Sequence, residues 1–201
     1  MTKLEAVNLA LDAIGEAPVN SLSSGLADAE TAERILNQTN RDVQSIGWHC
    51  NRDRKYTLTR DSNNQFSLPA KTLTVDTVDE DKHKNLVERA GFLYDVKNAT
   101  NTFNSANDND WSTLYVDIVM EQDFEDLTYS LQRYIAARAA RELQELVLSS
   151  VALDGFTRRK ESECYAVLLQ DEAEREDANV LYDNDFAYKI THRRNNRLYG
   201  I

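Results

Sequence analysis

Residues 1–22 decide the fold, and their sequence is MTKLEAVNLALDAIGEAPVNSL. Apolar residues recur in this segment at intervals of three and four, which predicts an amphipathic helix with the stripe Leu4, Val7, Leu11 and Ile14. Thr2 with Glu5 fits a capping box at the start of this helix. Gly15 fits a left-handed residue at its end, and Pro18 prevents the helix from continuing. The segment is therefore predicted to be a capped helix followed by a tight break.

A second amphipathic helix is expected after the break. Asp28 is expected to cap it, Gly47 to end it, and Trp48 to anchor the chain just beyond it. One face of this helix carries apolar and small residues, namely Ala32, Ile35, Leu36, Thr39, Val43 and Ile46. The two helices are predicted to pack as a hairpin, which is a common core element with no chemistry of its own.

Three runs of residues make this hairpin more specific than the general pattern. They are EAVN at 5–8, AIGEAPVNSL at 13–22, and RDVQSIGW at 41–48 followed by Asn51. These runs resemble the N-terminus of the tail tubular protein A family, the adaptor (head-to-tail connector) proteins of short-tailed bacteriophages. The resemblance is specific over residues 3–60, and beyond them the chain length and the order of elements also fit. It implies a structural protein of the virion tail, made in the host bacterial cytoplasm, with no catalytic residues and no cofactor to carry over.

The resemblance also implies the partners of the chain. It implies a closed homo-oligomeric ring, twelvefold, placed between the portal protein and the tail nozzle protein, tail tubular protein B. The tail fibre would be a further neighbour. Genomic DNA would pass through the lumen of the ring during ejection without specific binding.

The charge of the chain limits the classes of function. The chain has 201 residues and a formal net charge of -11. Such a charge argues against a protein that wraps DNA nonspecifically, because that class needs clustered Lys and Arg to displace counterions. An acidic protein can still line a channel for DNA, and solubility alone explains the same charge. The charge leaves both interpretations open.

The sequence shows no membrane anchor and no metal site. It has no apolar run of about 18 residues, and no signal peptide precedes the first helix, so synthesis in a cytoplasm is expected. The cysteines and histidines lack the spacing of zinc ligands; they are Cys50, Cys164, His49, His83 and His192. Neither a metal nor another cofactor is expected.

The middle of the chain changes from helical to alternating patterns. Candidate strands lie at 55–59, 65–68, 73–77, 91–96 and 113–120, and the last is the clearest because Leu114, Val116, Ile118 and Met120 share one face. Turn-rich polar segments separate them. Residues 100–110 are long and polar for a hairpin connection, which predicts an exposed, mobile loop. An antiparallel sheet inserted between helices is therefore expected.

Two further helices are expected after the sheet. Asp123 or Asp126 is expected to cap the first, and small residues on it allow a close neighbour, namely Ala136, Ala137, Ala139 and Ala140. A turn is expected at 153–155, followed by a helix over 156–179 with its core stripe in its first half. The apolar residues of this helix are Phe156, Tyr165, Val167, Leu168 and Ala173. The charged residues at 170–177 are either solvated or paired with a neighbouring subunit.

These observations together predict an α+β fold. A helical bundle, formed by the N-terminal hairpin and the two long C-terminal helices, is expected from residues 1–52 and 121–180. A β-rich insertion with an antiparallel sheet is expected over residues 53–120. Residues 181–201 are expected to form a C-terminal interaction tail.

The tail reverses the charge of an otherwise acidic chain. It combines aromatic and basic residues, the types enriched in protein interfaces. The residues predicted to contact the portal or a neighbouring subunit are Tyr182, Phe186, Tyr188, His192, Arg193, Arg194, Arg197 and Tyr199. A tail folded back on its own domain is an equal alternative, and contact of the arginines with DNA is a third.

Two other classes of function compete with a structural role. A virion-associated polysaccharide hydrolase needs two carboxylates, and Glu142 with Glu145, or Glu121 with Asp123, are the candidate pairs. With 34 acidic residues in the chain, such pairs arise by chance. A scaffold that acts during assembly and then leaves is the other alternative. The chain is not expected to be an enzyme.

Overall fold

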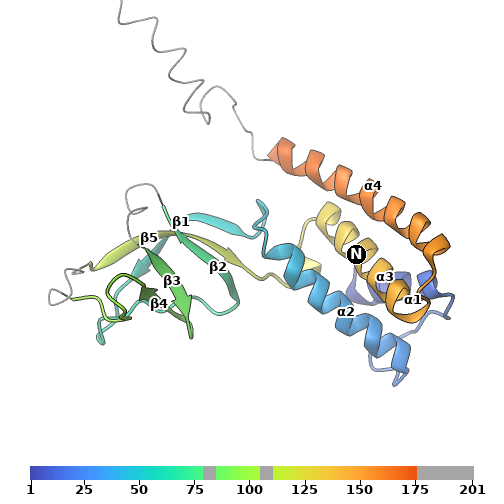
Figure 1. Cartoon of the computed structure of the whole chain (residues 1–201), viewed down its shortest axis with the longest axis horizontal. Helices are drawn as coiled ribbons and strands as arrows, with labels where there is room; N and C mark the ends of the chain where they lie inside the picture. The colour runs from blue at the N-terminus through green and yellow to red at the C-terminus, as the bar shows by residue number, and fades with distance from the viewer. Residues whose placement is uncertain (79–84, 105–110, 176–201) are drawn as a thin grey trace, which may run out of the picture.

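The fold is α+β, as the sequence predicts. A computed structural model describes residues 1–78, 85–104 and 111–175. Figure 1 shows a helical body at one end of the molecule and a β-rich module at the other. The helical body contains α1 (Lys3–Ile14), α2 (Ala27–Gln44), the 3-10 helix η3 (Phe124–Asp126), α3 (Tyr129–Val147) and α4 (Val151–Arg175). The β-rich module contains β1 (Arg52–Thr59), β2 (Thr72–Thr77), β3 (Leu86–Arg89), β4 (Phe92–Asp95) and β5 (Thr113–Met120).

Helix α1 begins and ends as predicted. Thr2 accepts a hydrogen bond from the backbone N–H of Glu5 at 3.2 Å, and the Glu5 carboxylate accepts one from the Thr2 N–H at 2.8 Å, which forms the capping box. Gly15 has φ of 81° and ends the helix in the left-handed region. The Asn8 side chain then holds the break, since it accepts from the Val19 N–H at 2.8 Å and donates to the Val19 carbonyl at 3.0 Å.

Helix α2 differs from the prediction at both ends. It begins at Ala27 after Leu26, so Asp28 lies inside the first turn and is not the cap. There its carboxylate faces the positive end of the helix dipole, which is favourable without a capping hydrogen bond. At the other end α2 stops at Gln44, and Ile46, predicted to be buried, is 62% exposed. The chain has already left the helical path there and turns at Gly47, with φ of 83°.

Helix α3 is the centre of the helical body. It packs against α1, α2 and α4, and its predicted small residues are all buried: Ala136, Ala137, Ala139 and Ala140. Neither Asp123 nor Asp126 caps it, because Thr128 occupies the N-cap position. Phe124 and Leu127 are buried in the core, so they hold the preceding segment in η3 and separate both carboxylates from the start of α3.

Helix α4 corrects two predictions. It begins at Val151, so the predicted turn at 153–155 is helical, and the reversal lies at Ser149, with φ of 49°. Its buried residues are Cys164 and Leu168, in the second half, whereas Phe156 of the expected core stripe is 75% exposed. Because α4 packs chiefly on α3, only a narrow stripe of it is covered.

The β-rich module has its own core. Its main sheet has the order β1-β5-β2, with both pairs antiparallel, and β3 pairs with β4 in a second antiparallel sheet. Buried residues between these sheets are Leu58, Phe66, Leu86, Leu93, Phe103, Leu114, Val116 and Ile118. The alternation predicted for residues 113–120 is confirmed by β5.

Two predictions for the module were wrong. Residues 65–68 do not form a strand; Ser67 makes a single bridge to Phe92 while Phe66 is buried. The segment at 100–110 is not wholly an exposed loop, because Phe103 is fully buried and its ring meets that of Phe66 edge-on at 5.0 Å. Residues 105–110 lie outside the described residues. Strand β3, which the sequence analysis did not predict, completes the hairpin with β4.

Candidate assembly interface

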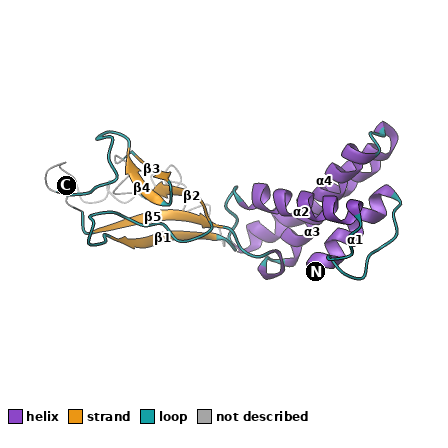
Figure 2. Cartoon of the chain, turned by 90° about the horizontal axis from the view of Figure 1, so that it is seen from below, coloured by secondary structure: helices purple, strands orange, loops and turns teal. Residues whose placement is uncertain are grey.

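A buried polar joint connects the helical body to the β-rich module. The Asn51 side chain lies at its centre. Its Nδ2 donates to the backbone carbonyl of Gln44 at 3.0 Å and to that of Met120 at 3.1 Å, and its Oδ1 accepts from the Trp48 N–H at 2.8 Å. One side chain therefore ties the end of α2 to the end of β5. Figure 2 shows β1 and β5 running side by side into the helical body at this point.

Gln44 and Gly47 complete the joint. The fully buried Gln44 side chain accepts from the Gln122 N–H at 2.8 Å and donates to the Gln122 carbonyl at 3.0 Å. A Cβ atom at Gly47 would lie 2.8 Å from Cγ2 of Val119, so the turn needs glycine for space as well as for its positive φ. The run at residues 41–51, quoted above for its resemblance, thus builds the element that sets the module on the body.

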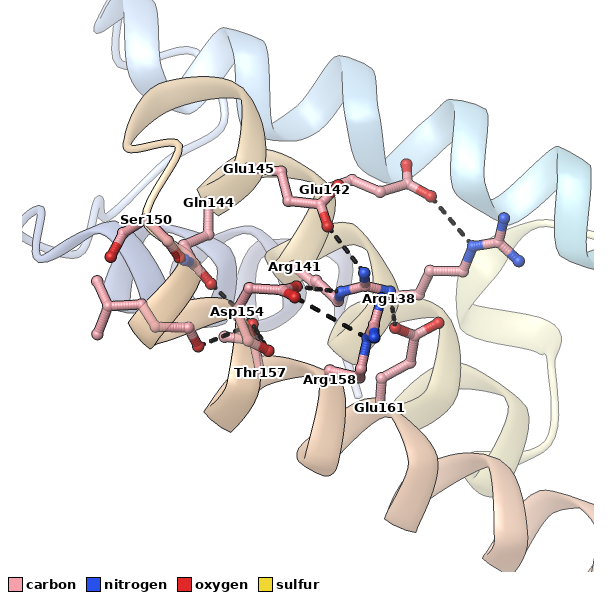
Figure 3. A network of polar contacts seen from close by, with 11 residues as sticks. Arg138, Arg141, Glu142, Gln144, Glu145, Ser150, Asp154, Thr157, Arg158 and Glu161 are labelled. Carbon is pink, nitrogen blue, oxygen red and sulfur yellow. Dashed lines mark hydrogen bonds and ion pairs between the residues drawn. The ribbon is translucent and has the colours of Figure 1, made fainter.

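A network of ion pairs holds α3 and α4 together (Figure 3). Arg141 of α3 lies at its centre, with Nε 2.7 Å from Asp154 Oδ1 and Nη1 3.0 Å from Glu161 Oε2, both on α4. Its Nη2 lies 2.8 Å from Glu145 Oε1. The hydrogen bonds to Asp154 and Glu161 raise the pKa of Arg141, and the bond from Arg141 lowers the pKa of the Asp154 carboxyl. Ion pairs between the facing sides of α3 and α4 therefore hold these two helices together as an α3–α4 hairpin.

The outside of this hairpin exposes large apolar side chains. Val151 is 89% exposed, Phe156 75% and Leu146 60%. We call the exposed apolar residues around the α3–α4 turn the hairpin patch; they are Leu146, Val147, Leu148, Val151, Leu153 and Phe156. Clustered exposed apolar residues of this kind mark protein contact sites. The hairpin patch is therefore the candidate assembly surface.

A groove runs along α4. It lies between the start of α3 and the second half of α4 and has a volume of about 610 Å³. Its walls include Tyr129, Arg133, Lys160 and Val167. Tyr129 is 64% exposed and Val167 57%. The surface of α4 thus offers apolar contacts beside charged ones along much of its length, as protein interfaces do.

The candidate catalytic carboxylates are engaged in structural contacts. Glu142 accepts from Arg138 at 3.0 Å and from the Thr39 hydroxyl at 2.9 Å, and Glu145 pairs with Arg141. The bond from Thr39 ties α3 to α2, whereas both ion pairs lie within α3.

The carboxylates of the second candidate pair, Glu121 and Asp123, make two separate ion pairs between the β-rich module and the helical body. Glu121 lies 3.5 Å from Arg41, and Asp123 lies 2.7 Å from Lys71. The hydrogen bond from Lys71 lowers the pKa of the Asp123 carboxyl, the opposite of what a general acid in glycoside hydrolysis requires.

The structure does not describe the tail residues that were predicted to contact the portal or a neighbouring subunit. All eight of them, from Tyr182 to Tyr199, lie outside the described residues. Within residues 1–78, 85–104 and 111–175, no group of three or more His, Cys, Asp or Glu side chains is arranged to hold a metal ion. Over the same ranges, no helix combines the length and apolar character needed to cross a membrane.

A family model described as "Tail tubular protein" matches residues 4–178. The chain belongs to the tail tubular protein family. It is similar to tail tubular protein A of Klebsiella phage KP34, with 29% identity over 137 residues, which cover 68% of this chain and 68% of that protein. The chain is thus a structural component of the virion tail, and the resemblance drawn from its N-terminal residues is confirmed.

Sequence reasoning missed the residues that build the candidate surface. Phe156 was assigned to the core, because helical spacing alone does not say which face meets a neighbour. Arg141, which orders the charges beside this surface, carried no motif of its own. Three cations in sequence on α4, Arg158, Arg159 and Lys160, were an available signal, since a basic run in an acidic chain indicates a surface.

Proposed function

We propose that this tail tubular family member forms the adaptor ring that joins the portal to the tail nozzle and lets DNA pass during ejection. The hairpin patch is the observation that carries the proposal. Its apolar side chains, with Val151 at 89% and Phe156 at 75% exposure, are removed from water when a neighbouring chain covers them. A ring of identical subunits supplies such a chain at every position.

The shape of the subunit supports this assignment. The helical body and the β-rich module have separate hydrophobic cores and lie at opposite ends of the molecule (Figure 1). The joint at Asn51 and Gln44 fixes one against the other. An adaptor must bind different partners on its two sides, and two modules at a fixed angle provide two separate surfaces. The body would form the ring and meet the portal, while the module would face the nozzle and the tail fibre.

Twelve copies in a closed ring are proposed, with DNA in the lumen. A cyclic ring uses heterologous contacts, in which one surface of a subunit meets a different surface of the next. The net charge of -11 fits a lumen that holds the duplex weakly, because like charges do not retain DNA. The tail residues 181–201, with their aromatic and basic side chains, are proposed to contact the portal or the neighbouring subunit.

Electron microscopy of the purified full chain, alone and mixed with portal protein, tests the proposal. We expect twelvefold rings seated on the portal. A chain that stays monomeric when portal is present would contradict the adaptor role. Because the portal can act as the template for the ring, a monomer in its absence is compatible with the proposal.

Two variants locate the contact within this experiment. Phe156→Asp places a charge on the hairpin patch, whereas Tyr115→Asp places one on β5, where Tyr115 is 50% exposed. Both side chains are largely in water in the free subunit, so both variants are expected to fold. We expect Phe156→Asp to abolish the ring and Tyr115→Asp to leave it intact. Equal assembly by both would remove the hairpin patch from the proposal.

The tail and the scaffold alternative have their own tests. A chain without residues 181–201 is expected to lose portal binding or ring formation, and unchanged behaviour in both assays would remove the tail from the interface. A transient scaffold would be absent from the mature virion. We expect a fixed number of copies per virion, measured by quantitative mass spectrometry against the portal.

A further inference from the structure

We infer that the ring contact pairs the outward face of α4 in one copy with the α1–α2 corner of the next copy. The α4 face is defined by Phe156, Arg158, Arg159 and Lys160. The α1–α2 corner is defined by Asp12, Glu16, Asp28 and Glu30. This inference rests on the proposed ring and names the two surfaces that meet in it.

The charge of the α4 face is a product of the tertiary structure. Between residues 154 and 163 the sequence carries equal numbers of cations and anions: Arg158, Arg159, Lys160, Asp154, Glu161 and Glu163. On the side of α4 that faces α3, Arg141 of α3 forms ion pairs with Asp154 at 2.7 Å and Glu161 at 3.0 Å. Arg158, Arg159 and Lys160 are exposed on α4, where Arg158 also lies 3.9 Å from Asp154 and Arg159 pairs with Glu163 at 3.0 Å. The side chains of Arg158 and Arg159 are 66% and 81% exposed.

The α1–α2 corner carries the opposite charge. Its four carboxylates are exposed and come from the last turn of α1, the loop after it and the first turn of α2. The nearby cation Lys3 is already engaged, with its Nζ 2.7 Å from Glu33. Arg34 is the cation that follows on α2. The corner therefore presents mainly negative charge to a partner.

The two surfaces cannot neutralise each other within one chain. Figure 1 shows α4 on one side of α3 and α2 on the other, and α1 packs on α3 and α2. The start of α4, the end of α1 and the start of α2 all lie at the end of the helical body away from the β-rich module. Two complementary surfaces at the same level, on different sides of a subunit, meet when copies stand side by side in a ring. This is the heterologous geometry that cyclic symmetry requires.

Apolar residues accompany the charges on both sides. Phe156 and Val151 are exposed beside the cations. On the corner, Leu26 is 56% exposed and Leu9 38%. An interface needs apolar area for its free energy and opposite charges for its register and partner choice. Both surfaces supply both components, so a second copy of this chain fits the α4 face.

Charge reversal on each side tests the pairing. One variant carries Arg158→Glu and Arg159→Glu, and the other carries Asp28→Lys and Glu30→Lys. We expect each variant alone to need about tenfold or more subunit for half-maximal ring formation on the portal, because like charges then face each other. In an equimolar mixture every contact is complementary again, provided that the two variants alternate. A twelvefold ring allows this alternation, so the mixture is expected to assemble.

The controls separate folding, the pairing and the ring itself. Lys55→Glu with Lys97→Glu, on exposed positions of the β-rich module, changes the net charge by the same amount as Arg158→Glu with Arg159→Glu and is expected to assemble. Thermal melts of each subunit check that the reversed variants fold.

If the native chain forms rings and the reversed variants do so equally well, the pairing is wrong and the adaptor role stands. If each variant fails and their mixture also fails, the two surfaces do not meet. If the native chain forms no ring with portal, the proposed function fails first.

Discussion

Gly47 lies so close to Val119 that a Cβ atom added to it would sit 2.8 Å from Cγ2 of that residue. Gly47 also has φ of 83°, in the region that L side chains rarely adopt. The backbone of the turn after α2 therefore packs against the end of β5. At Gly47 this contact leaves no room for a side chain. This contact joins the two modules at the joint.

Gly47→Ala is expected to destabilise the chain more than Gly25→Ala does. Gly25 has φ of 72° and nothing within 4 Å of an added Cβ, so that variant carries the backbone strain alone, about 1 kcal/mol. Gly47→Ala adds the clash with Val119, about 1–3 kcal/mol more. Urea unfolding measures both. Adding Val119→Ala should recover part of the difference, and no recovery would show that the clash is not the cause.

Asn51→Ala is expected to weaken the joint. It leaves the carbonyls of Gln44 and Met120 and the N–H of Trp48 without this partner, in a site where Asn51 is 3% exposed. Leaving such buried groups unsatisfied costs about 1–3 kcal/mol. Asn37→Ala, on the exposed face of α2, is the matched control and should change stability by less than about 0.5 kcal/mol. Equal unfolding free energies for the two variants would contradict the structural role of Asn51.

Arg141→Gln is expected to raise the pH at which the chain unfolds in acid. The folded-state pKa of Asp154 is lowered by Arg141, so this carboxylate binds its proton more weakly in the folded than in the unfolded chain. Its contribution to stability is present above its unfolded pKa, about 3.9, and is lost as the pH falls through the lower folded value. Removing Arg141 removes that contribution.

The acid midpoint of the Arg141→Gln variant, followed by circular dichroism, should move up by about 0.3–0.5 pH unit. Arg34→Gln removes the same formal charge from an exposed site on α2 and is the control. A midpoint that moves equally in both variants would assign the effect to net charge and not to the hairpin network.

Excision of the β-rich module is expected to leave a folded helical body. Met120 donates its backbone N–H to the Asn51 carbonyl at 2.9 Å, and Arg52 pairs with Val119, so the two ends of the insertion are adjacent. Replacing residues 53–119 with a short Gly-Ser linker should therefore need little loop-closure entropy. Cooperative thermal unfolding with high helical content is expected. Loss of cooperativity would show that the body needs the module to fold, against the predicted division at residues 52 and 121.

Several elements were predictable because their determinants are local. The capping box of Thr2 with Glu5 and the left-handed Gly15 lie within one segment, and the alternation of β5 lies within eight residues. Strand β3 was missed because its burial pattern covers four residues and gives too short an alternation. The cap of α3 was misplaced because Asp123 and Asp126 have capping side chains, while Phe124 and Leu127 determine the path of the chain by burial.

The candidate interface depended on contacts that are distant in sequence. The three cations of α4 were visible, but their neighbours Asp154 and Glu161 made the segment neutral on average. Only Arg141, on another helix, turns those two carboxylates inward. Phe156 was assigned to the core for a related reason, since periodicity gives a helix an apolar stripe but not the partner that covers it.

By itself, the sequence determined the α+β fold, the N-terminal helical hairpin and the family, because capping, periodicity and the run around Gly15 are encoded in neighbouring residues. The tertiary structure decided which side of α4 faces solvent and which charges remain there, because burial and ion pairing are properties of chains brought together from distant positions. The same structure decided that Gly47, Trp48 and Asn51 serve as the joint of two modules, since the carbonyl of Met120 and the side chain of Val119 reach them only across the folded sheet.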